Sequence, residues 1–214
     1  MRILLNDVIQ NSDVPNALKT PALSDAFNIG GAITVNLGAA RRIDCIGIGN
    51  TDGSTFNING QNITFNGNGL YMLQTPLNTN RLTISADATF VGRIAAGLAM
   101  RIGTSVRKEP SFNSTAEPRA TLSGQVIPGR GGHIFRAVSL DSRYQIDENI
   151  MGEIKEGYRY IAMGYPFFIS LEEESYKLPF DKLYAIDRNQ KNLSFESGAR
   201  RFLFSRRWFF EERF

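Results

Sequence analysis

The sequence predicts a mainly β protein, with an N-terminal antiparallel β-sandwich and a C-terminal α+β barrel-like domain that contains one helix. Short runs of β-branched and aromatic residues, broken by Gly, Asn and Pro, fill the first half of the chain. Seven or eight short strands without a helix are typical of a sandwich. A single helical pattern then occurs among the strands of the second half.

The charge of the chain changes near its middle. Residues 1–105 contain thirteen charged side chains and no glutamate, whereas residues 106–214 contain every glutamate and most of the charge. The stretch 105–119, SVRKEPSFNSTAEPR, is polar and contains two prolines. We therefore expect a boundary or linker there, between a domain of residues 1–105 and a second domain of residues 106–214.

The strands expected in the first domain are separated by turn residues. Asn59-Gly60 lies between two of them and is a type I′ hairpin signal, the sharpest local prediction in the chain. Cys45, the only cysteine, lies in an apolar run and is expected to be a buried small side chain. The predicted strands are ITVNL (33–37), DCIGIG (44–49), STFNI (54–58), QNITF (61–65), GLYML (69–73), RLTIS (81–85) and TFVGRI (89–94).

The second domain mixes strands with one predicted helix. Asp147 suits an N-cap, and apolar residues then recur at spacings of three and four, which predicts a helix over about 148–162. The apolar face of this helix would be Ile150, Ile154, Tyr158 and Ile161. The predicted strands are RATLSGQVI (119–127), HIFRAVSL (133–140), YPFFISL (165–171), KLYAID (182–187), NLSFES (192–197) and the terminal RRFLFSRRWFFEERF (200–214).

The terminal stretch allows three interpretations: a nucleic-acid contact, a membrane anchor, or a β-strand. Glu196, Glu211 and Glu212 lie close to its arginines and argue against an anion-binding surface, and it has neither a helical moment nor a long apolar run. A core strand with Arg–Glu pairs on its outer face is favoured, followed by an interface strand. The interface candidates are Arg200, Arg201, Arg206, Arg207, Trp208, Phe210 and Phe214.

The composition argues against an enzyme, a cofactor and a metal centre. His133 is the only histidine, and no nucleophile motif accompanies it. The segment GIGNTDG (47–53) has the wrong spacing for a dinucleotide loop. Three adjacent glutamates at 172–174 indicate a solvated turn more than a glycosidase pair. The net charge of +3 is weak support for nucleic-acid binding, and no signal peptide or membrane span is recognisable, so we expect synthesis in a cytoplasm.

The first half contains the segments ITVNLGAARRIDCIGIGN, NGLYMLQ and NRLTISADATFVGRIAAG. Through these segments it resembles discoidin or galactose-binding-like jelly rolls, over roughly residues 15–103. It implies a jelly-roll sandwich and allows a carbohydrate-binding module or adhesin that recognises a cell-surface glycan. Tyr71 is the candidate for stacking on a sugar, with support from the many Asn and Thr residues nearby.

In the second half, PRATLSGQ and SLDSRYQI are followed by the predicted helix, GYPFFISL and the aromatic terminal strand. This order of elements is similar to the barrel-plus-helix units of tailed-phage tail-tip proteins. The resemblance implies a distal tail or baseplate protein of a long-tailed phage, a structural virion component made in the host cytoplasm. It would form a homo-oligomeric ring of three or six copies and contact other tail proteins. The jelly roll comes first here, whereas the common distal tail arrangement places the ring-forming barrel first.

Overall fold

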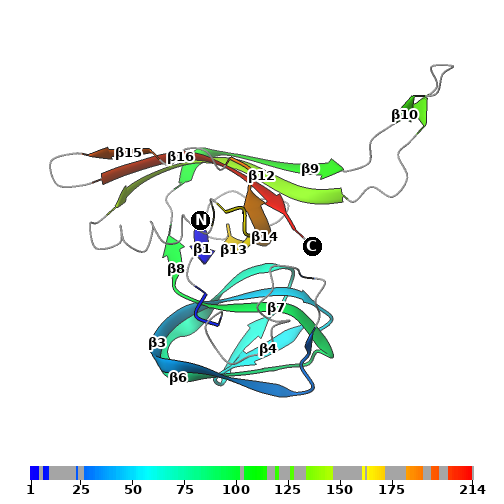
Figure 1. Ribbon diagram of the computed structural model, residues 1–214, viewed down its shortest axis with the longest axis vertical. Coiled ribbons are helices and arrows are strands. Elements are labelled where there is room, and N and C mark those ends of the chain that lie inside the picture. The colour runs from blue at the N-terminus through cyan, green and yellow to red at the C-terminus, as the bar shows by residue number, and fades with distance from the viewer. Residues whose placement is uncertain are drawn as a thin grey trace.

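The computed structural model describes residues 1–4, 7–9, 23, 27–101, 104–114, 119–120, 126–127, 134–146, 161, 163–171, 182–189, 194–197 and 202–213. Their strands form antiparallel sheets of six and eight strands and a separate two-stranded pair. The prediction of a mainly β protein is confirmed. Figure 1 shows the six-stranded sheet at one end of the molecule and the eight-stranded sheet at the other.

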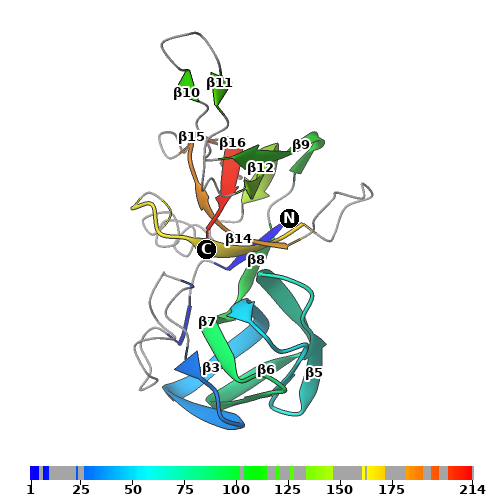
Figure 2. The same cartoon turned by 90° about the vertical axis from the view of Figure 1, so that its right-hand side faces the viewer.

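The six-stranded sheet, which we call the curled sheet, contains the strands predicted for the first domain. Its order is β2–β7–β3–β6–β4–β5. Its strands form one hydrogen-bonded sheet that curls around its own core (Figures 1 and 2), whereas a jelly roll packs two sheets face to face. The strands are β2 (Phe27–Asn28), β3 (Ala32–Thr51), β4 (Thr55–Ile58), β5 (Gln61–Thr64), β6 (Gly69–Ala86) and β7 (Phe90–Gly97).

β3 and β6 bend at an irregular corner, which explains why the strands form one curled sheet instead of the two sheets of a jelly roll. Asn36 pairs with Arg81 and Arg41 with Thr79, so residues 37–40 of β3 lie opposite a single residue of β6. Gly38 within this excursion has φ +75° and donates its N–H to Oδ1 of Asn36 at 3.0 Å. Such bulges bend a strand and increase its twist. β3 and β6 therefore both bend at this corner, and each strand runs along two sides of the curled sheet.

The predicted type I′ turn is confirmed at the tip of β4 and β5. Asn59 has φ +47° and Gly60 φ +88°, and Ile58 pairs with Gln61. The Asn59 amide donates to the carbonyl of Arg81 and accepts from the N–H of Thr83. These two hydrogen bonds attach the hairpin to β6, where β4 is already paired.

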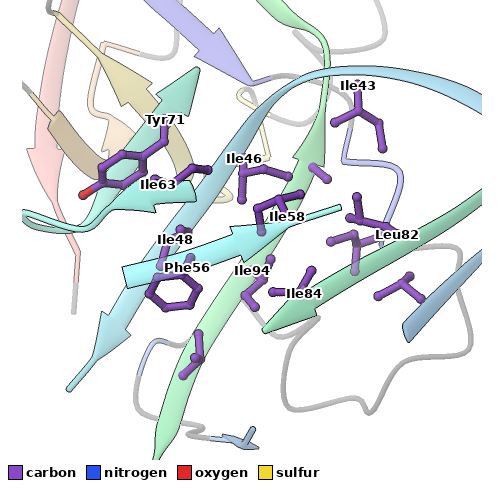
Figure 3. Close-up of a cluster of buried hydrophobic side chains, with 14 of the residues drawn as sticks. Ile43, Ile46, Ile48, Phe56, Ile58, Ile63, Tyr71, Leu82, Ile84 and Ile94 are labelled. Atoms are coloured by element: carbon purple, nitrogen blue, oxygen red, sulfur yellow. The ribbon is translucent and has the colours of Figure 1, made fainter. Parts of the chain in front are cut away.

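The core of the curled sheet lies inside the curl. Figure 3 shows Ile46, Ile48, Phe56, Ile58 and Ile94 directed towards one another from β3, β4 and β7. All five side chains are almost completely buried. The strict alternation of β4 and the apolar centre of β3 place these residues inside, as expected for strands with one face on a core.

The eight-stranded sheet, which we call the large sheet, has the order β8–β1–β13–β14–β16–β12–β9, and β15 also pairs with β16. Figures 1 and 2 show β9, β12 and β16 as a long ribbon above the shorter strands. The strands are β1 (Arg2–Leu4), β8 (Ala99–Arg101), β9 (Thr104–Ser114), β12 (Ile134–Ile146), β13 (Phe167–Ser170), β14 (Lys182–Asp187), β15 (Ser194–Ser197) and β16 (Phe202–Glu212).

Three expectations for the second half meet different outcomes. The stretch 105–119 was expected as a linker, but most of it forms β9 because it pairs with β12. The single strand expected over 119–127 is instead β10 (Arg119–Ala120) paired with β11 (Val126–Ile127). Of the predicted helix over 148–162, Ile161 is helical and the rest lies outside the described residues.

Sheet membership does not follow the expected boundary at residue 105. β1 and β8 pair with each other, and β1 also pairs with β13, so both belong to the large sheet. β1 and β8, which come before and after the strands of the curled sheet in the sequence, therefore attach that sheet to the large sheet. This pairing joins residues far apart in the chain, and no local pattern indicated it.

Close packing joins the two sheets. Phe168 and Tyr184 of the large sheet are buried against Cys45 and Leu70 of the curled sheet. A Cβ added at Gly47 would lie 2.1 Å from Cδ2 of Phe168, so only glycine leaves room for this ring. Cys45 is buried as predicted, and its thiol donates to the carbonyl of Gly97 at 3.3 Å.

Candidate assembly surfaces

The terminal strand β16 lies inside the large sheet rather than at its edge. It pairs with β12 along residues 202–211 and with β14 at residues 210–212. β15 pairs with the opposite edge of its first part. Its backbone is therefore used within the chain, which confirms that the terminal stretch forms a strand and favours the core-strand interpretation.

Trp208 and Phe210 belong to the core of the large sheet. They are buried and stack with ring centroids 5.4 Å apart, and Phe167 meets Phe210 edge-on at 5.8 Å. Their prediction as interface residues is wrong because residues two apart on a strand share a face, and this face points into the core. Arg207, which precedes Trp208 and lies on the opposite face of the strand, is exposed. Only the backbone of Arg206 is described, and Arg200, Arg201 and Phe214 lie outside the described residues.

Arginines pair with the two glutamates at the end of β16. Glu212 accepts hydrogen bonds from the backbone N–H of Arg136 at 3.1 Å and from its Nε at 2.9 Å. Glu211 accepts from Nε of Arg188 at 2.9 Å and from its Nη2 at 2.7 Å, and Arg213 lies 3.5 Å away. The expected Arg–Glu pair on the outer face is thus confirmed for Glu211, with Arg188 supplied by another segment, whereas Glu212 is buried on the same face as Trp208 and Phe210.

An apolar surface is exposed where β9 and β12 extend beyond this core. Phe112 is 60% exposed and Ile134 is 69% exposed. Phe112 pairs with Arg136 and Ile134 with Ser114, so both side chains lie on the same face of the ribbon, diagonally across the two strands. We call this pair the ribbon patch. Phe112 stands in the polar segment PSFNST, and the contrast between this ring and its neighbours is the signal that sequence reasoning missed.

Tyr71, the candidate for sugar stacking, is a core residue. It is 5% exposed, its ring lies 5.9 Å from that of Phe65, and Nζ of Lys182 lies 5.0 Å from its centroid. Its hydroxyl donates to the carbonyl of Gly67 and accepts the N–H of Asn66. Tyr71 therefore offers no platform for a sugar, because alternation in β6 turns the ring inward.

Asp7 and Arg93 form a buried ion pair where the chain passes from β1 to the curled sheet. Oδ1 of Asp7 accepts the N–H groups of Ile9 at 3.0 Å and Ala96 at 3.1 Å, and its Oδ2 lies 3.2 Å from Nη2 of Arg93. Both side chains are nearly buried. Burial raises the pKa of Asp7 to about 6, although Arg93 and the two N–H groups act in the opposite direction.

Asp7 is expected to make the protein more stable as the pH falls from 7 to 4. The folded protein binds the Asp7 proton more tightly than the unfolded chain does, so its contribution is complete below about pH 4 and lost as the pH rises through 6. The shift of about two pKa units corresponds to roughly 3 kcal/mol. Urea unfolding of the wild type and of Asp7→Asn from pH 4 to 7 measures it. Parallel stability profiles for the two proteins would contradict the prediction.

Three arginines lie together at the corner of the curled sheet. Arg41 and Arg42 pair with Thr79 and Asn78 of β6, and Arg81 follows two residues after Thr79. All three arginines are exposed. Within the part of the chain that the structure describes, none of them has an ion-pair partner. We call them the arginine corner.

Two aspartates lie in the adjacent loops that follow β3 and β6. Asp52 accepts the N–H groups of Thr89 and Phe90, and Asp87 accepts those of Ser54 and Thr55. The hydrogen bond from the Thr89 hydroxyl is the largest cause that lowers the pKa of Asp52, and the Thr55 N–H is the largest cause that lowers that of Asp87. Both carboxylates are exposed. Their hydrogen bonds hold them in position, and the lowered pKa values keep them ionised at neutral pH.

The described residues contain no group of three or more His, Cys, Asp or Glu side chains that could hold a metal ion. His133 and the glutamates at 172–174 lie outside them. In the described part, no helix has the length and hydropathy needed to cross a membrane. Comparison with protein-family models, curated proteins and solved structures finds no match to this chain.

Proposed function

We propose that this chain is a structural protein that assembles with copies of itself, and that the ribbon patch is its main contact. The observation that carries the proposal is the pair of exposed apolar side chains, Phe112 and Ile134, at the end of an ordered ribbon. Exposed aromatic and aliphatic side chains on a rigid element mark protein contact sites. Pro110 lies on the edge strand β9 and has no N–H to donate, which protects this edge from strand addition, so the contact uses the face of the ribbon.

The assembly that fits best is a ring at the tail tip of a long-tailed phage. The order of elements in the second half resembles such proteins, and the close packing between the sheets would let each copy act as a rigid unit. A ring requires one patch to meet a different patch on the next copy. A closed ring of three or six copies, flanked by other tail proteins in the virion, is the proposed state. The curled sheet, in the place of the jelly roll, would be displayed outward.

Native mass tests this function. We expect the purified protein to form a trimer or hexamer in light scattering and a ring in negative-stain images. Phe112→Ser with Ile134→Thr should shift the protein to monomers while its thermal unfolding stays close to that of the wild type, since both side chains are exposed. Phe112→Tyr with Ile134→Val is the matched control and should still assemble.

A wild-type protein that stays monomeric at high concentration would contradict the proposal. Glycan binding, the alternative function, has lost the aromatic platform on which it depended, because Tyr71 is buried. A glycan array with the monomeric variant would test it independently, and reproducible binding there would favour the adhesin alternative.

A further inference from the structure

The arginine corner places three exposed arginines at neighbouring positions of β3 and β6. Arg41, Arg42 and Arg81 gather there because the register jump in β3 brings the first two beside residues 78–81 of β6. Asp44, the nearest acidic residue in the sequence, uses its Oδ1 to accept the N–H of Ala99 at 2.7 Å. The three arginines are exposed and have no ion-pair partner among the described residues.

Asp52 and Asp87 form the acidic end of the same sheet. Asp52 follows the end of β3 and Asp87 follows the end of β6. At the rise of a β-strand, these positions lie roughly 30 Å from Arg42 along β3 and roughly 20 Å from Arg81 along β6. The two charged ends are too far apart to pair within one copy of the chain.

We propose that the arginine corner of one copy contacts the acidic end of the next copy, head to tail, as a second part of the assembly contact. This inference rests on the proposed function. The two patches have opposite charge, each lacks an ion-pair partner within the described chain, and at least six strand positions separate the arginines from either aspartate. A contact between two different patches repeats from copy to copy, as ring assembly requires. Arginine suits this role because its guanidinium group can bind a carboxylate through two parallel hydrogen bonds.

A polyanion from outside the chain is the competing occupant of the arginine corner. It would need the arginines but not the acidic end. No exposed aromatic side chain is described at the corner, where the neighbours are Asn36, Asn78, Thr79 and Asn80, so base stacking has no platform there. The acidic end of a second copy is the occupant for which the chain itself supplies complementary charge.

Two variants, each of which lacks one of the two charged patches, test the inference. Arg41→Glu with Arg81→Glu removes the basic end, and Asp52→Asn with Asp87→Asn removes the acidic charge while keeping amide oxygens as acceptors for the loop N–H groups. Thermal unfolding first establishes that both variants are folded. Analytical ultracentrifugation of labelled protein then gives the dissociation constant of each variant with itself and with the other.

We expect each variant to associate with itself at least tenfold more weakly than the wild type. The mixture should associate about tenfold more tightly than either variant alone, because it restores one intact contact for each pair of copies. Arg81→Gln and Arg207→Gln change the net charge equally, and only the first should weaken assembly. Arg207 is the control because it is exposed on β16 of the large sheet, away from both charged patches of the curled sheet.

The outcomes separate this inference from the proposed function. If the wild type assembles and the arginine variant has the same dissociation constant, the head-to-tail contact is wrong and the ribbon patch stands. If only the arginine variant is impaired, and polyphosphate binds the wild type but not this variant, an external polyanion occupies the corner and the inference is overturned. A monomeric wild type removes both proposals.

Discussion

Trp208→Ala is expected to lower the free energy of unfolding by about 4 kcal/mol, the usual loss when a buried tryptophan is truncated in a core. Trp208 is 1% exposed, pairs with Leu140 across β12 and β16, and stacks on Phe210. Removal of the ring leaves a cavity at the centre of the large sheet, which its closely packed neighbours can fill only in part. Urea unfolding followed by circular dichroism measures the change.

Arg207→Ala is the matched control, since Arg207 is exposed on the opposite face of the same strand. Its effect should stay within about 0.5 kcal/mol. Equal losses for the two variants would contradict the placement of Trp208 in the core. A Trp208→Ala protein that keeps full stability but no longer assembles would restore the interface interpretation of this residue.

Gly47→Ala should cost about 3 kcal/mol, the upper part of the usual range for overpacking. A Cβ at this position would lie 2.1 Å from Cδ2, 2.5 Å from Cγ and 2.7 Å from Cε2 of Phe168. The ring cannot retreat easily, because it also packs on Tyr184 at 4.5 Å between centroids. The strain therefore acts on the junction between the two sheets. Thermal and urea unfolding measure the loss.

Two further variants show whether Phe168 is the cause. Gly49→Ala, two residues along the same face, meets mainly a methyl group of Leu23 at 2.7 Å, a flexible side-chain end that can move, so it should cost less. In a Phe168→Ala background the added methyl group has room, and Gly47→Ala should cost little more than zero. Strictly additive losses in the double variant would show that the clash lies elsewhere.

Local chemistry made several elements of this fold predictable. The turn at Asn59 and Gly60 requires positive φ at both residues, and few dipeptides other than Asn-Gly allow it. β13, β14, β15 and β16 fall where short aromatic and β-branched runs indicated strands. Cys45 is buried because its run is apolar on both sides of the strand. In each case the information lies within a few neighbouring residues.

The candidate surfaces depended on pairing that a sequence does not display. The terminal stretch was correctly predicted as a strand, yet whether Trp208 faces a partner or its own core depends on what covers each face of the sheet. Tyr71 is a candidate for sugar stacking in the sequence alone, but Lys182, more than a hundred residues away, lies over its ring. The arginine corner likewise exists only because β3 jumps register against β6.

Local residue patterns are enough to predict that this protein is mainly β, where most of its strands lie and how the β4–β5 hairpin turns. Long-range contacts settle that β2 to β7 form one curled sheet, that β1 and β8 join the large sheet, and which aromatic rings are buried. The reason is physical. Strand propensity and turn geometry are set by adjacent residues, whereas register, sheet membership and burial depend on long-range contacts whose energies exceed local preferences.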